Sequence, residues 1–255
     1  MNDNGLVSKL LLNDRKIINL IVQSLLGKNV SADDYAVAST EWANGSKSDI
    51  LYVSGDKATN VRPPILIEIQ CQVNQNFMTS LIRSSTSVYN RYKVLPIVLI
   101  FAIKGFSDNT TKEEFTTNKR QYLLKISSKF WAKECSLSSI ASINEHIIQS
   151  PTDESVVLGY FLISGSLSLM LLEHKSNPTV QLIYNITMQI FLREGNGKAS
   201  KKIVTDQILE DTKRQLEKIL EEDTTQEPDI KKIKHPLYSI CVTAWQKQGM
   251  EKHIR

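Results

Sequence analysis

Two short stretches decide the fold: Ser48-Asp49-Ile50-Leu51-Tyr52-Val53 and Ile65-Leu66-Ile67-Glu68-Ile69-Gln70. Both have the length and apolar content of buried strands, yet each carries a carboxylate. Glu68 and Gln70 are two residues apart, so a strand places both on one face and the three isoleucines on the other. A buried carboxylate is costly unless a cation or hydrogen-bond donors meet it. Asp49 and Glu68 therefore predict a divalent ion held by oxygen ligands, which is the chemistry of phosphodiester cleavage.

A structural alternative exists for both acids. Asp49 can cap the turn after Asn44-Gly45-Ser46, and Glu68 can lie on a solvated strand face, as most carboxylates in hairpins do. Against this, Leu66 shares the face of Glu68, which indicates that the face is at least partly covered.

The segments before the second strand predict its neighbours. Residues 6–26 show helical apolar spacing interrupted at Asn13-Asp14, which predicts two helices. Asn44-Gly45 separates two strand-like segments, and both turn residues tolerate positive φ, so we expect a hairpin. Pro63-Pro64 then leads into the strand of Glu68, giving three consecutive antiparallel strands.

After that strand the pattern becomes helical over residues 77–92. A helical wheel predicts that one face is buried, made of Phe77, Met78, Leu81, Ile82, Val88, Tyr89 and Tyr92. The opposite, polar face is made of Thr79, Arg83, Thr86 and Asn90. The apolar run 94–103, broken only by Pro96, is typical of a strand covered on both faces. The helix between the two strands makes a crossover connection, so we expect a mixed α/β sheet flanked by helices.

The rest of the chain is less regular. Residues 105–119 are rich in Ser, Asp, Asn and Thr and predict a solvated loop, residues 122–126 an edge strand, and the Ser-rich run 136–143 is ambiguous. Helices are expected over 154–175, 179–193, 198–222 and 236–252. We thus expect an α/β core over residues 6–145 and a helical C-terminal region over residues 150–255.

The order of these pieces resembles the PD-(D/E)XK (restriction-endonuclease-like) nuclease core, and more closely its Rpn and transposase-like branch. The resemblance covers about residues 8 to 104 and is carried by Leu11-Leu12-Asn13-Asp14, Asp49, Glu68-Ile69-Gln70, Phe77-Met78 with Arg83 and Tyr89, and Leu95-Pro96-Ile97-Val98-Leu99-Ile100. It implies a catalytic set of Asp49, Glu68 and Gln70, in which the two acids hold Mg²⁺ or Mn²⁺. Gln70 stands where the superfamily most often has lysine, although the Rpn-like branch commonly has glutamine there.

The resemblance also implies a third acid and contacts to phosphate. Asp14 and Glu41 are the candidates for the acid, and an N-cap is an equally good interpretation of Asp14. Arg83 and Lys93 are the candidates for phosphate contact. The alternatives are that Arg83 faces solvent and that Lys93 only complements a helix C-terminus.

Composition narrows the function classes. A chain of 255 residues with 41% hydrophobic and 23% charged residues is ordinary for a globular protein, and a net charge of +4 permits a polyanionic partner without requiring one. Three widely spaced cysteines and four scattered histidines match neither a disulfide framework nor a zinc site, so an intracellular location, nuclear or cytoplasmic, is expected. The apolar run 156–172 is diluted by glycine and serine, which favours a buried helix over a membrane span.

The preferred function is therefore metal-dependent endonucleolytic cleavage of DNA by a relative of mobile-element nucleases, with a homodimer as a candidate assembly. The alternative is a catalytically inactive, domesticated nuclease fold that binds nucleic acid or a protein partner. A membrane-associated helical protein is a third interpretation.

Overall fold

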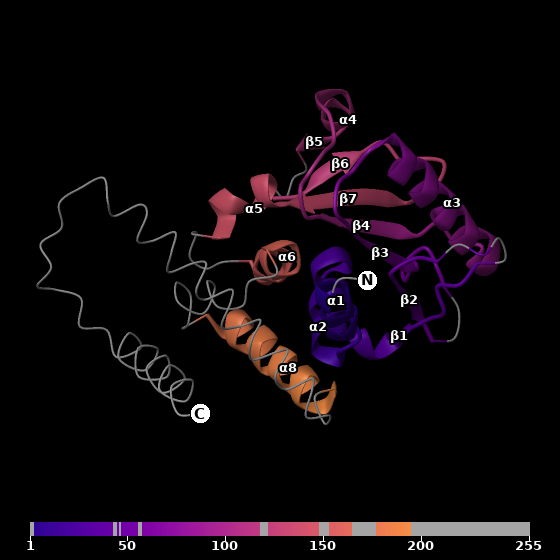
Figure 1. Ribbon diagram of the computed structural model, residues 1–255. Coiled ribbons are helices and arrows are strands. Elements are labelled where there is room, and N and C mark those ends of the chain that lie inside the picture. The colour runs from indigo at the N-terminus through magenta and orange to yellow at the C-terminus, as the bar shows by residue number, and fades with distance from the viewer. Residues whose placement is uncertain are drawn as a thin grey trace, which may run out of the picture. The chain divides into compact units, whose positions relative to one another are not determined.

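A computed structural model describes residues 3–42, 45, 47–55, 58–117, 122–147, 153–164 and 177–194. All of these residues belong to one compact unit, Met1–Ile208. They form an α/β structure in which helices flank a mixed sheet of seven strands (Figure 1). The expected class, an α/β fold with a mixed central sheet, is confirmed.

The elements follow one another as two helices, a three-stranded meander, a crossover helix and a second group of strands and helices. The first part comprises α1 (Asp3–Leu12), α2 (Arg15–Leu26), the 3-10 helix η1 (Ala32–Asp34), β1 (Tyr35–Val37), β2 (Ile50–Ser54), β3 (Ile65–Gln70), α3 (Gln75–Tyr92) and β4 (Ile97–Ala102). The second part comprises α4 (Asn109–Glu113), β5 (Thr116–Thr117), β6 (Leu124–Ile126), β7 (Glu134–Ser139), α5 (Ile140–Ile147), α6 (Glu154–Ser164) and α8 (Pro178–Glu194).

The strands lie in the order β1-β2-β3-β4-β7-β6-β5. β1, β2 and β3 are antiparallel neighbours, and the register places Ile50 opposite Ile67 and Tyr52 opposite Ile65. β4 is parallel to β3 and to β7, and α3 makes the crossover that the first parallel pair requires. The predicted hairpin, meander and crossover are therefore confirmed.

Each face of the sheet has its own helical cover (Figure 1). On one face α3 packs its apolar side onto the central strands, in a cluster that includes Leu51, Leu66, Leu81, Val88, Val98 and Ile100. On the other face α1, α2, α6 and α8 pack over a cluster that includes Ile18, Ile21, Tyr52, Ile67, Phe101, Phe161 and Ile183. Glu68 lies two residues beyond Leu66 and so belongs to the α3 face.

The buried face of α3 differs from the wheel in part. Ile82 and Tyr89 are 38% and 43% exposed, so their assignment to the buried face is wrong, whereas Ser84 and Ser85 are buried. A serine is tolerated in a core when its hydroxyl is paired, and the Ser85 hydroxyl donates to the carbonyl of Trp131.

The segment after β4 is more ordered than predicted. The expected loop over residues 105–119 contains α4 and β5, because Asp108 caps a short helix by accepting from the Thr111 N–H. The ambiguous Ser-rich run forms most of β7, which lies between β4 and β6. The β7 serines are buried and hydrogen bonded: Ser136 donates to Glu134, and Ser139 and Ser142 bond one another at the start of α5.

Of the C-terminal helices, the one predicted over 179–193 is confirmed by α8, and the start of the one over 154–175 by α6. α6 is buried over most of its length and contacts α2, α5, β4 and β7, as expected for a core helix. Among the described helices, none is both long and apolar enough to cross a membrane. Residues 165–176 and the helices expected over 198–222 and 236–252 lie outside the described residues.

Candidate active site

The structure brings Asp49 and Glu68 together at one end of the β2–β3 pair. Asp49 directly precedes β2, and extending the register by one residue places it opposite Glu68 on the same face. The Oδ2 atom of Asp49 accepts the backbone N–H of Ile69 at 2.9 Å. The carboxylate of Glu68 in turn accepts the backbone N–H of Asp49. The two acids are thus held by each other's strand.

The hairpin between β1 and β2 orients Glu68. The Ser48 hydroxyl donates to the Glu68 carboxylate, and the Ser48 Oγ atom accepts Nε1–H of the buried Trp42 at 3.0 Å. The guanidinium of Arg91, in the last turn of α3, lies 4.5 Å from the Trp42 ring centroid. Arg91 also donates to the backbone carbonyls of Ser39 and Glu41. The end of α3 therefore fixes the hairpin that supplies a donor to Glu68.

α1 supplies a cation to the same pair. The Lys9 Nζ atom lies 2.8 Å from Oδ1 of Asp49, and the side chains of Lys9 and Asp49 are 36% and 21% exposed. Lys9 is in the last turn of α1. This contact ties the N-terminal helix to the beginning of β2.

The environment of Glu68 opposes its ionisation. Burial raises the pKa of the Glu68 carboxyl to about 8, and the negative charge of Asp49 adds to this rise. Hydrogen bonds from Ser48 and from the Asp49 N–H, together with the charge of Lys9, lower the pKa by less. A second cation at the acid pair would favour the ionised form of Glu68.

Gln70 follows Glu68 on the same face, at the end of β3. Its Nε2 atom donates to the backbone carbonyl of Gln72 at 3.1 Å, in a partly exposed position. The amide therefore lies at the rim of the acid pair and brings no charge to it.

Comparison of the chain with protein-family models, with curated proteins and with solved structures found no match.

The two candidates for a third acid have other partners. Oδ1 of Asp14 accepts the Lys16 N–H at 2.9 Å, and Asp14 is the N-cap of α2, which matches the structural alternative. Glu41 pairs with Lys47, whose hydrogen bond and charge lower the pKa of the Glu41 carboxyl. In the described part of the chain, no group of three or more His, Cys, Asp or Glu side chains is arranged to hold a metal ion.

The candidates for phosphate contact lie on or beside α3. Arg83 is exposed on its polar face. Lys93 is the C-cap of α3 in the left-handed conformation, with φ of 58°, and its N–H donates to the Tyr89 carbonyl at 2.7 Å. The described contacts join neither side chain to Asp49 or Glu68.

The donor set fits a hard divalent ion. Magnesium keeps several waters and is usually held by one or two carboxylates together with substrate phosphates. Asp49 and Glu68 supply two half-buried carboxyl groups on one face, and the surroundings of Glu68 oppose its ionisation unless a further cation is present. The pair therefore suits Mg²⁺ or Mn²⁺, with water and phosphate as the remaining ligands.

Sequence reasoning missed Lys9, Ser48 and Trp42. Ser48 directly precedes Asp49 in the sequence, so its position next to the acid pair could have been predicted. Lys9 gave no comparable signal, because a single lysine in an apolar helix is common and its partner is 40 residues away.

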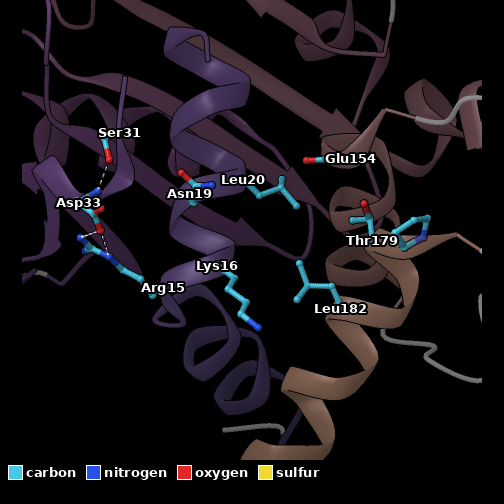
Figure 2. Close-up of a pocket in the computed structure, with 10 residues that line it drawn as sticks. Arg15, Lys16, Asn19, Leu20, Ser31, Asp33, Glu154, Thr179 and Leu182 are labelled. Atoms are coloured by element: carbon cyan, nitrogen blue, oxygen red, sulfur yellow. Dashed lines mark hydrogen bonds and ion pairs between the residues drawn. The ribbon is translucent and has the colours of Figure 1, made fainter. Parts of the chain in front are cut away.

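A hollow of about 500 Å³, separate from the acid pair, lies between α2, η1 and the beginnings of α6 and α8. Figure 2 shows Leu20 of α2 and Leu182 of α8 in it, with Arg15 bound to Asp33 at its rim. Arg15 donates to Asp33 at 2.8 Å and to the Tyr35 carbonyl at 2.6 Å. No two acids of this hollow lie opposite one another on paired strands, as Asp49 and Glu68 do, so the acid pair is the stronger candidate for chemistry.

Proposed function

We propose that this chain is a metal-dependent endonuclease with a PD-(D/E)XK core, and that Asp49 and Glu68 form its catalytic centre. The observation that carries the proposal is the placement of these carboxylates opposite one another at the end of an antiparallel strand pair. The arrangement of helices, three-stranded meander, crossover helix and parallel strand around the pair is the one that the sequence resemblance implies, and it supports the same proposal.

Each residue near the pair has a role in this proposal. Asp49 and Glu68 hold the ion, and Ser48 keeps the Glu68 carboxylate oriented through its hydrogen bond. When bound, Mg²⁺ or Mn²⁺ supplies a Lewis acid for the scissile phosphate and for the attacking water. The amide of Gln70, at the rim, can hold a water by hydrogen bonding but cannot stabilise charge as lysine does.

DNA is the proposed substrate. Arg83 and Lys93 are proposed phosphate contacts, and the sequence resemblance is the basis for both residues. The sequence resemblance points to relatives of mobile-element nucleases. A homodimer remains a prediction, as does an intracellular location.

The direct test is cleavage of supercoiled plasmid by the purified full-length chain with Mg²⁺ or Mn²⁺. We expect nicked and linear products that disappear when EDTA is added and when Asp49 is replaced in Asp49→Asn. Glu113→Gln is the matched control, because Glu113 is an exposed acid on α4, outside the β2–β3 pair. Equal product from wild type and Asp49→Asn would contradict the proposal.

A second candidate function is a catalytically inactive nuclease fold that binds nucleic acid or a protein partner. Two contacts favour it: the Gln70 amide is bonded to the Gln72 carbonyl, and Lys9 is paired with Asp49. On this alternative the wild type binds DNA in a gel-shift assay but does not cleave it when Mg²⁺ or Mn²⁺ is added. Glu68→Gln then binds Mn²⁺ as wild type does.

A further inference from the structure

Lys9 contacts the acid pair from outside the two strands that carry it. Its ammonium reaches Oδ1 of Asp49 from α1, and its charge is felt at Glu68. The other oxygen of Asp49, Oδ2, already accepts the N–H of Ile69. Each carboxylate oxygen has two lone pairs, so an ion can still bind Asp49, but at Oδ1 it would lie beside the Lys9 ammonium.

An ammonium and a divalent ion are poor neighbours at one carboxylate oxygen. Positive charges only a few ångströms apart repel each other strongly in a partly buried site. Binding of the ion to Oδ1 should therefore displace Lys9 from Asp49. The lysine stem is flexible, and the side chain is 36% exposed, so its ammonium can turn toward solvent.

We propose that Lys9 is an internal counter-ion of the acid pair, which binds Asp49 in the metal-free protein and turns to the DNA phosphate once a divalent ion displaces it. This inference rests on the proposed function. It supplies from α1 the positive charge that Gln70 does not bring to the end of β3. It also predicts that Lys9 weakens metal binding and yet increases the rate of cleavage.

The test is Mn²⁺ affinity of the full chain, measured from the electron paramagnetic resonance signal of the free ion. Lys9→Gln should bind Mn²⁺ roughly tenfold more tightly than wild type, because a competing cation is gone. Lys9→Arg keeps the charge and should bind Mn²⁺ about as wild type does. Lys16→Gln is the matched control: it removes the same charge from α2, where Lys16 lines the hollow of Figure 2, and should leave the affinity unchanged.

Single-turnover cleavage at saturating Mn²⁺ supplies the second half of the test. Lys9→Gln should cleave DNA more slowly, by roughly tenfold or more, although its metal site is fuller, since a cation beside the phosphate is lost. A merely structural role for Lys9 predicts weaker Mn²⁺ binding in Lys9→Gln, so tighter binding separates the two.

Wild-type protein provides a check that does not depend on a folded variant. Addition of Mn²⁺ should increase the acetylation of Lys9 by acetic anhydride, read by mass spectrometry, and should leave Lys16 unchanged. Suppose that Mn²⁺ binding is shown to depend on Glu68. Unchanged Lys9 acetylation, or unchanged Mn²⁺ affinity in Lys9→Gln, would then overturn the inference about Lys9 and leave the proposed function standing. Equal Mn²⁺ binding by wild type and Glu68→Gln would instead overturn the proposed function.

Discussion

The two ends of the β2–β3 pair are built on one backbone ladder and have opposite chemistry. At one end Leu51 lies opposite Leu66 and Tyr52 opposite Ile65, and all four side chains are fully buried. At the other end the same register brings Asp49 to Glu68. The apolar end contributes buried side chains to both cores, whereas the acidic end holds two carboxyl groups and opposes the ionisation of Glu68. The apolar end therefore stabilises the fold, and the acidic end, whose side chains do less for stability, is the end to which we assign the proposed chemistry.

Removing the charge of Glu68 should produce the largest effect on function. Glu68→Gln is expected to lower Mn²⁺-dependent cleavage by at least about 100-fold, as loss of one electrostatic element of a catalytic site does. DNA affinity at fixed salt should stay level or rise, because an acid near a polyanion is gone. Cleavage and fluorescence-anisotropy titrations on the same samples measure both. Loss of DNA binding together with cleavage would assign Glu68 to binding or folding.

Truncating the apolar end should affect stability. Leu66→Ala and Leu81→Ala remove packing between β3 and α3, and each should lower the free energy of unfolding by roughly 2 to 5 kcal/mol, as large-to-small core changes do. Urea denaturation measures this. The control is Ile82→Ala, one residue along α3, where the exposed side chain predicts a change within about 0.5 kcal/mol. Similar costs at Leu81 and Ile82 would show that the two faces of α3 are misassigned.

The acidic end should make stability depend on pH. The pKa of Glu68 is about 8 in the folded protein, above the ordinary value of 4.5 expected for the unfolded chain, so folding favours the protonated acid. Its contribution is fully present below the unfolded pKa and is lost as pH rises through the folded pKa. Relative to Glu68→Gln, wild type should lose on the order of a few kcal/mol between pH 5 and pH 8.5.

Urea unfolding of both proteins across that pH range tests this dependence. A constant difference between wild type and Glu68→Gln would mean that Glu68 ionises freely. Saturating Mg²⁺ should reduce the wild-type loss, because an ion at the pair stabilises the charged form.

The smallest expected effect is at the rim. Gln70→Lys should preserve cleavage or raise it by up to about tenfold, since it restores a cation beside the attacked phosphate. Rates at saturating Mg²⁺ measure it. Identical background cleavage in wild type, Gln70→Lys and Asp49→Asn would favour the binding-module alternative over the nuclease.

Much of the fold could be predicted from periodicity. The apolar runs of β3 and β4 and the 3.6-residue pattern of α2 and α3 carry strong local signals, so the meander and crossover were visible. β7 could not be predicted as a strand, because a run of serines has no apolar pattern. Its serines are buried by the position of β7 between β4 and β6, which is a tertiary feature. The ordered α4 and β5 were missed because Asp108 and its polar neighbours resemble a loop until the cap forms.

The candidate site could be predicted only in part. The two acids followed from strand spacing, which fixes faces without knowledge of the rest of the chain. Lys9 and Trp42 reach the pair through tertiary packing, which a single sequence does not reveal. Asp14 had two interpretations, and its capping of α2 is the one that the described contacts support.

The central position of β4 affects how the chain folds during synthesis. All six residues of β4 are buried, and its outer edge is covered by β7, which begins 32 residues after β4 ends. Until residues 134–139 leave the ribosome, β4 presents a long apolar edge to other chains, the kind of edge that promotes aggregation. A chain truncated after residue 133 should therefore form insoluble protein even though its meander, crossover helix and acid pair are complete.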